Sequence, residues 1–161
     1  MRKRFEANLT LGATPISEIK FPIKYRDKLT AILLALHSIY INTELSEKIF
    51  LLLENKIISG KKNTGRLGMD LWNILVLGVI RVGMSYTYDE ICYASNYDTL
   101  LRQLLGINDV FYVNRKEFSY RMIHENISKF TPEMLDEINA LIADYGSKII
   151  KKRRRTARNK G

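Results

Sequence analysis

The segment that most constrains this fold is residues 70–84, which is apolar on nearly every side when read as a helix. Its apolar residues are Leu71, Trp72, Ile74, Leu75, Leu77, Val79, Ile80 and Val82. A helix of this kind needs other elements to cover all of its faces. The sequence therefore predicts a central buried helix capped by Asp70, and Gly78 and Gly83 predict close approach of its neighbours.

Two helices are predicted before this segment, because apolar residues recur there at spacings of three and four. The first begins near Arg26. The second follows Thr43, a candidate cap, and ends at Gly60. Residues 5–11 and 19–23 alternate apolar with other residues, which predicts a small β-hairpin or a pair of extended arms.

Four helices are predicted after the central segment. A capping box at Thr87–Glu90 opens the first, and Asp98 caps a short second one. These two, with a third over 120–128, resemble a helix-turn-helix grouping. Thr131-Pro132-Glu133 opens the last helix, with Gly146 as a candidate interruption.

The last eleven residues differ in charge from the rest of the chain. They hold seven of its 26 basic side chains and none of its 17 acidic ones. A block of like charges repels itself and is expected to stay disordered until it meets a polyanion. Nucleic acid is the predicted partner, because neutralising phosphates releases counterions. The alternative is an end that only improves solubility.

The predicted fold class is therefore mainly α, a compact bundle of six or seven helices. The expected organisation is a short extended arm or hairpin over residues 1–25, a helical DNA-binding domain over 26–150 and a disordered basic tail over 151–161. Residues 29–41 and 71–84 are the longest apolar stretches. Both fall short of the roughly 20 residues that a membrane-spanning helix needs. No apolar run follows the N-terminal Met-Arg-Lys-Arg, and the chain has one cysteine. A cytoplasmic protein without membrane contact is therefore expected.

The candidate metal ligands and nucleophiles have simpler explanations. His37, His124 and Cys92 do not stand at metal-ligand spacing from one another, so no metal site and no cofactor are expected. His37 is interpreted as a packed histidine and Cys92 as a buried, inert thiol. A two-metal nuclease site needs a cluster of carboxylates. The acids at positions 70, 89, 90 and 98 are explained as helix caps, so we expect no catalysis by this chain.

Basic side chains with interleaved tyrosines predict the DNA contacts. In the helical domain the candidate DNA-binding residues are Lys61, Lys62, Arg66, Arg102, Arg115, Lys116 and Arg121. In the tail they are Lys151, Lys152, Arg153, Arg154, Arg155 and Arg158. We expect the tail to contact phosphates and residues held by helices, such as Arg102 or Arg121, to read bases. The alternative is that the tyrosines pack in the core.

Three ordered blocks carry a resemblance to a known family. They are GRLGMDLWNILVLGVIRVG (65–83), YTYDEICYASNYDTLLRQLLGI (86–107) and KEFSYRMIHENISKFTPEMLDEINALIADYGSKIIKK (116–152). Together with the opening segment they resemble the N-terminal helical region of bacterial insertion-sequence transposases of the DDE class, in the ISNCY group. The resemblance covers roughly residues 3–152. After residue 152 the family pattern has mixed charges, whereas this chain is basic throughout.

The resemblance implies that the helical region binds the double-stranded DNA of the element ends. In the family an RNase H-like domain with the acidic triad follows, and no catalytic residue of that domain has a counterpart here. The expected function is DNA binding in transposition without strand cleavage. The rival is an interaction module that forms a homodimer or binds a full-length transposase. An exposed apolar stripe on Leu29–Ile41 or Ile49–Ile57 would favour that rival.

Overall fold

A computed structural model describes residues 2–6, 12–60, 68–108 and 115–159 of the chain. Within these residues the fold is helical and contains no strand, which confirms the mainly α prediction. The elements are η1 (Ile16–Glu18), α1 (Lys28–Ile41), α2 (Thr43–Leu53), η2 (Glu54–Ile58), α3 (Leu71–Met84), α4 (Tyr88–Tyr97), α5 (Thr99–Leu104), α6 (Tyr120–Ile127) and α7 (Pro132–Arg158). Residues 5–6 and 19–23 form no hairpin, and residues 7–11 lie outside the described ranges.

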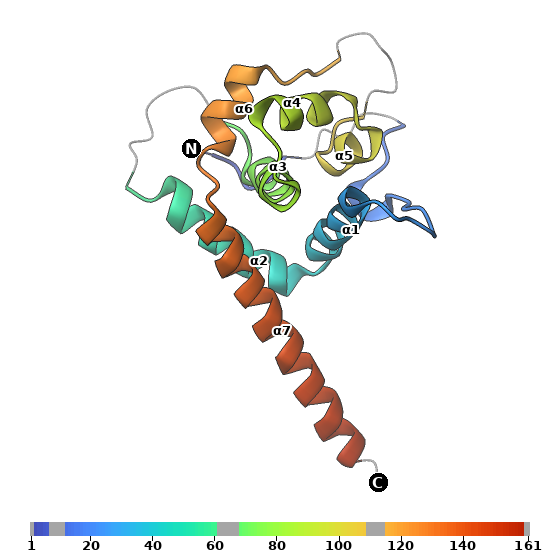
Figure 1. The fold of residues 1–161 in the computed structure, drawn as a ribbon. Coiled ribbons are helices and arrows are strands. Elements are labelled where there is room, and N and C mark those ends of the chain that lie inside the picture. Colours follow the sequence, from blue (N-terminus) through green and yellow to red (C-terminus); the bar gives the residue numbers. More distant parts are fainter. Residues whose placement is uncertain (1, 7–11, 61–67, 109–114, 160–161) are drawn as a thin grey trace.

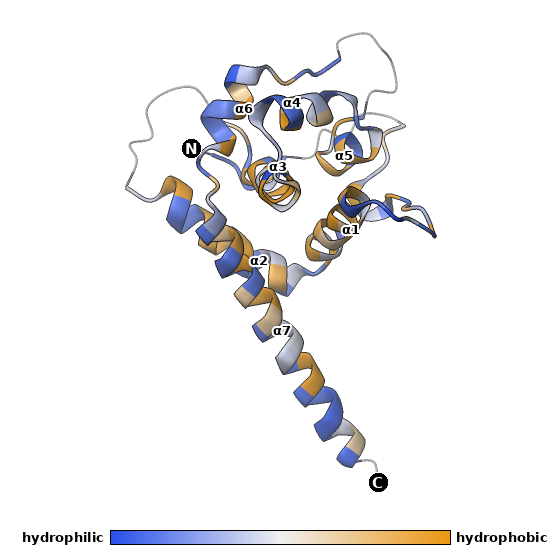
Figure 2. Cartoon of the chain, in the orientation of Figure 1, coloured by the Kyte–Doolittle hydropathy of each residue, from blue (hydrophilic) through white to orange (hydrophobic). Residues whose placement is uncertain are grey.

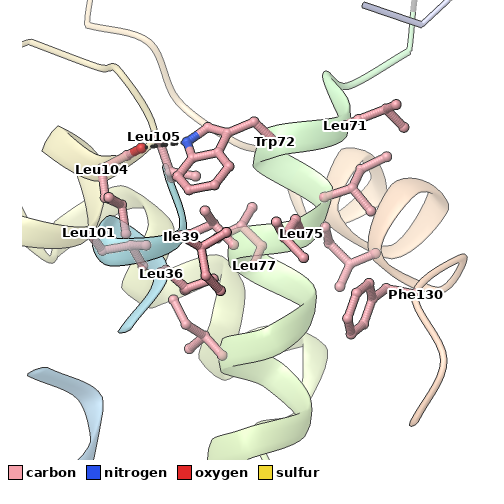
Figure 3. Close-up of a cluster of buried hydrophobic side chains, with 14 of the residues drawn as sticks. Leu36, Ile39, Leu71, Trp72, Leu75, Leu77, Leu101, Leu104, Leu105 and Phe130 are labelled. Carbon is pink, nitrogen blue, oxygen red and sulfur yellow. Dashed lines mark hydrogen bonds between the residues drawn. The ribbon is translucent and has the colours of Figure 1, made fainter. Parts of the chain in front are cut away.

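Helix α3 is the centre of the bundle, as its sequence predicts (Figure 1). It packs against α1, α2, α4, α6 and α7, and seven of its apolar side chains are almost completely buried. Trp72 donates from Nε1 to the carbonyl oxygen of Leu104 at 2.8 Å, which ties α3 to the end of α5 (Figure 3). An all-round apolar helix is stable in water only when neighbours cover it in this way.

The glycines of α3 mark close approaches, as predicted. A Cβ on Gly78 would lie 2.4 Å from Cγ of Phe130, in the turn between α6 and α7. A Cβ on Gly83 would lie 3.2 Å from Cδ1 of Ile32, on α1. Phe130 itself is 2% exposed, and its ring packs directly against the α3 backbone at Gly78.

The N-terminal segment caps α3, which the sequence did not predict. The amides of Leu71 and Trp72 donate to the carbonyl oxygens of Lys3 and Arg4, at 3.0 and 2.9 Å. Asp70 stands at the N-cap position but makes no side-chain cap, and its carboxylate accepts from the amide of Glu6 at 3.3 Å. Two of the unsatisfied amides at a helix start are therefore met by backbone from a distant part of the chain.

Other helix ends follow the predicted cap chemistry with one shift. The capping box of Thr87 and Glu90 is complete, and the Asp98 carboxylate accepts from the amide of Leu101 at 2.8 Å. For α2 the cap is Asn42, not Thr43, since Asn42 Oδ1 accepts from the amide of Leu45 at 3.0 Å. Thr43 is the first helical residue.

The apolar residues that recur at helical spacing form the core of the bundle. Leu33, Leu36, Trp72, Leu75 and Leu104 are all 2% exposed or less. Leu52 and Val79 are only half-buried and lie at the edge of the core. On α2 the fully buried leucine is the next residue, Leu53.

The predicted disorder of the tail is not confirmed, because α7 continues as one helix through residue 158. It crosses α2 and then extends away from the bundle (Figure 1). Gly146 does not interrupt it. Repulsion within the charged block favours disorder. The helix forms because Lys and Arg are good helix formers and cations are favourable at a helix C-terminus.

Candidate nucleic-acid interface

The end of α7 presents the densest positive charge among the described residues. Its basic side chains are Lys151, Lys152, Arg153, Arg154, Arg155 and Arg158, and every one is exposed. Five of them are consecutive, so they surround the helix completely at 3.6 residues per turn. Figure 2 shows this end of α7 as mostly hydrophilic, in contrast to the apolar faces within the bundle.

Arg102 is not a surface residue, which corrects its prediction as a base reader. It is 4% exposed, and its guanidinium donates to the carbonyl oxygens of Ser95 at 2.9 Å and Lys116 at 2.7 Å. These two bonds tie α5 to the end of α4 and to the segment before α6. A guanidinium buried and bonded in this way cannot reach a base edge without disrupting the fold, so Arg102 has a structural role.

Arg115 and Lys116 lie just before α6, and they differ in exposure. Arg115 is half-buried, donates to the carbonyl oxygen of Asn96 and stacks 5.2 Å above the ring of Tyr97. Lys116 is exposed, with its Nζ 5.7 Å above the ring of Phe118. Lys116 is therefore the more exposed cation of this pair.

Arg121 is the most exposed predicted base reader, with 87% of its side chain accessible. It pairs with Glu125 one helical turn later at 2.7 Å, and this bond raises the pKa of Arg121 and lowers that of Glu125. An exposed pair of this kind is weak and screened by salt, so a phosphate could compete for the guanidinium. Lys61, Lys62 and Arg66 lie outside the described residues.

Several tyrosines near these cations are on the surface. Tyr93, Tyr97 and Tyr120 are 68%, 59% and 48% exposed, which argues against the alternative that these three form a small core. Tyr93 and Tyr97 lie one turn apart on α4, with ring centroids separated by 4.7 Å. Exposed rings beside cations suit stacking on bases or hydrogen bonding to phosphates.

A cleft of about 620 Å³ lies between the start of α3 and α6. Its cationic lining comes from Arg2, Lys116, Arg121 and Lys129, against two carboxylates, Asp70 and Glu125. Arg2 donates to the carbonyl oxygen of Met69 at 2.9 Å and to Oδ1 of Asn126 at 2.7 Å, and burial lowers the pKa of its guanidinium. The cleft therefore carries an excess of positive charge.

Asn73, which the sequence reading overlooked, also lines this cleft. It is 4% exposed, and its Oδ1 is buried with no hydrogen-bond partner among the described residues. Leaving a buried acceptor unsatisfied costs about 1–3 kcal/mol. The signal in the sequence was a single amide between apolar residues at the start of α3.

The remaining candidate groups are structural. His37 is buried with a ring nitrogen 2.8 Å from the carbonyl oxygen of Ile16, which confirms a packed histidine. Cys92 is half-buried, and burial together with the charge of Asp89 raises the pKa of its thiol, which disfavours the reactive thiolate. No group of three or more potential metal ligands occurs in the described ranges.

Within the described parts of the chain no single helix has both the length and the apolarity of a membrane span. The pair Lys28–Ile41 and Thr43–Ile58 has them together, but with a bend of 100° between its members. No protein-family model, curated protein or solved structure matches this chain.

Proposed function

We propose that this chain binds double-stranded DNA as the DNA-binding N-terminal part of an insertion-sequence transposase. The observation that carries the proposal is the basic end of α7, where six exposed Lys and Arg side chains surround a helix that extends beyond the bundle. The resemblance of the three sequence blocks supplies the biological context. In this proposal the chain contacts DNA and does not itself cut it.

The shape of α7 suits this role. An α-helix with its side chains is about 10–12 Å across, and the major groove of B-DNA is about 12 Å wide. The basic segment 151–158 extends from the bundle without covering contacts, so its side chains can reach phosphates on both sides of a groove. Because the cations point in all directions, this end supplies affinity rather than sequence discrimination.

Sequence discrimination needs side chains that the bundle holds in place. With Arg102 excluded by burial, Lys116 and Arg121 are the described candidates that remain exposed. Both lie at the α6 side of the domain, next to Tyr120. We therefore assign the non-selective phosphate contacts to the end of α7 and the contacts that discriminate between DNA sequences to the region of α6.

Titrations of two charge-matched variants test this division. One variant changes Arg153, Arg154 and Arg155 to Gln, which keeps the helix propensity. Its control changes the exposed Lys20, Lys24 and Lys28 to Gln and removes the same charge elsewhere. The DNA targets are a duplex carrying an end of the encoding element and a shuffled duplex of equal length.

The α7 variant should weaken binding to both duplexes and reduce the log–log salt slope by up to about 2.7, which is three contacts at about 0.9 each. The control should change the slope much less. Arg121→Gln should reduce the preference for the element end. If the α7 variant and its control change the DNA affinity and the salt slope equally, the proposed role of α7 is wrong. Absence of DNA binding by the native chain at low salt would refute the function.

The rival function, an interaction module, has limited support in the surface of α1 and α2. Ile41 and Leu51 are 55% and 53% exposed, but Leu29, Leu34 and Leu52 are half-buried and Leu36 is covered. Isolated exposed apolar residues are normal on a soluble surface. Light scattering over a concentration series distinguishes the two functions, since a module that dimerises should show a mass above 18.7 kDa.

A further inference from the structure

The cleft between α3 and α6 combines two features that a general phosphate contact does not explain. Its rim carries the exposed cations Lys116 and Arg121, whereas its least exposed polar residue is the amide of Asn73. Its volume of about 620 Å³ falls within the range of about 300–1,000 Å³ typical of small-molecule sites. A flat DNA-binding surface would not require the buried amide.

The buried Oδ1 of Asn73 calls for a hydrogen-bond donor. It has no partner in the described structure, whereas Asn126 in the same lining accepts from Arg2 and from the amide of Met69 and donates to the carbonyl oxygen of Met122. Buried polar groups without partners are rare, and each invites an explanation such as an absent ligand. An anion alone would not satisfy an acceptor, so the ligand must also carry N–H or O–H groups.

The apolar part of the lining limits the ligand further. Phe118 is 4% exposed and Met122 is half-buried, and both line the cleft beside the polar groups. They offer contact to a flat apolar face. A nucleotide unit has all three properties, because its phosphate is anionic, its base edge carries N–H donors and its base has an apolar face.

We propose that this cleft binds a single nucleotide unit, with the base edge at the amide of Asn73 and the phosphate at Lys116 and Arg121. Asn side chains pair well with base edges because the amide both donates and accepts. The unit can be a free nucleotide or an unpaired nucleotide of a DNA strand. The DNA source rests on the proposed function, and the free nucleotide does not.

The first experiment measures binding of deoxyadenosine monophosphate to the full chain by calorimetry, with deoxyribose 5-phosphate as the ligand without a base. The native chain should bind the nucleotide at least about tenfold more tightly than the sugar phosphate. Asn73→Leu should remove this difference. Lys116→Gln should weaken binding of both ligands, and Lys28→Gln, on α1, should leave both unchanged.

Thermal unfolding separates a binding role of Asn73 from a structural one. Removing an unsatisfied buried amide should leave the melting temperature unchanged or raise it by a few degrees. If the larger side chain in Asn73→Leu prevents folding, Asn73→Ala tests the same loss of the amide. Full nucleotide affinity in the folded variant would overturn the proposal, as would equal binding of the two ligands by the native chain.

The second experiment distinguishes the source of the nucleotide. Three duplexes are titrated at one salt concentration. The first has one unpaired adenosine, the second has one unpaired abasic site and the third has no bulge. Tighter binding of the adenosine bulge alone, lost in Asn73→Leu, assigns the site to DNA. If deoxyadenosine monophosphate binds but the bulge adds nothing, the ligand is a free nucleotide. If the chain binds the plain duplex but not deoxyadenosine monophosphate, the cleft proposal is refuted and the proposed function is unaffected.

Discussion

The indole Nε1 of Trp72 donates to the carbonyl oxygen of Leu104 at 2.8 Å, and both residues are fully buried. The bond joins the central helix to α5, which has only six residues. Helices this short are not stable alone in water, so tertiary contacts hold α5 in place. The geometry of the helical bundle therefore depends on the packing around Trp72.

Trp72→Phe should lower the free energy of unfolding by at least about 1–3 kcal/mol, because it leaves the carbonyl oxygen of Leu104 buried without a donor. Denaturant unfolding measures the loss. Tyr93→Phe, at a site 68% exposed, is the control and should change stability by less than about 0.5 kcal/mol. Equal stabilities of Trp72→Phe and the native chain would show that the bond contributes nothing net.

Leu75→Ala should cost about 2–5 kcal/mol, since Leu75 is 1% exposed in the middle of α3 and its loss leaves a cavity. The matched change Leu51→Ala, at 53% exposure on α2, should cost much less. Chemical denaturation of both variants gives the comparison. A loss below about 1 kcal/mol for Leu75→Ala would contradict the central position of α3.

Two glycines in helices should respond in opposite directions to alanine. Gly78→Ala places a Cβ 2.4 Å from Cγ of Phe130 and should destabilise the fold by about 1–3 kcal/mol. Gly146→Ala, on α7 with open space around it, should stabilise by about 0.5–1 kcal/mol through helix propensity. Melting temperatures of the two variants should therefore move apart, and a stabilised Gly78→Ala would refute the close approach.

The link between Arg4 and Glu54 should make stability depend on acid pH. Arg4 donates to Glu54 at 2.6 and 3.0 Å, and this bond lowers the pKa of the Glu54 carboxyl below its usual 4.5. The carboxyl therefore binds its proton less readily in the folded chain, so its contribution is present above the unfolded pKa and is lost as pH falls through the folded one. Arg4→Gln should destabilise at pH 7 and make little difference at pH 2. An effect that is constant across this range would exclude the carboxylate as its source.

The purified chain should neither nick nor join DNA in the presence of Mg²⁺ or Mn²⁺. No cluster of potential metal ligands occurs in the described ranges, and the two-metal mechanism needs such a cluster. Incubation with supercoiled plasmid is the measurement. Cleavage that disappears when one acidic residue is changed would overturn the expectation.

The sequence predicts those features of the fold that depend on interactions between residues close together in the chain. The all-round apolar pattern of residues 70–84 predicted a buried central helix, and the capping box at Thr87–Glu90 predicted the start of α4. Both are local, because the spacing along a helix decides which side chains share a face. Asn42 replaced Thr43 as the cap of α2 because neighbouring residues offer the same side-chain chemistry.

The candidate site could be predicted only in part. The sequence identified Arg121 and Lys116 as cations of the α6 region, and both are exposed. It placed Arg102 with them, although α5 turns that side chain inward toward the carbonyl oxygens of Ser95 and Lys116. The sequence did not single out Asn73. One amide in a largely apolar helix indicates a binding site only when the residues that face it across a cleft are known.

What the sequence by itself determined is therefore the helical class, the buried character of α3 and most helix ends, since these follow from periodicity and from caps within four residues. The tertiary structure decided the rest. It alone brought Lys3 and Arg4 to the start of α3, buried Arg102, and formed a cleft around Asn73. These features join residues many positions apart, and the energy of such contacts depends on packing in space, which spacing along the chain does not encode.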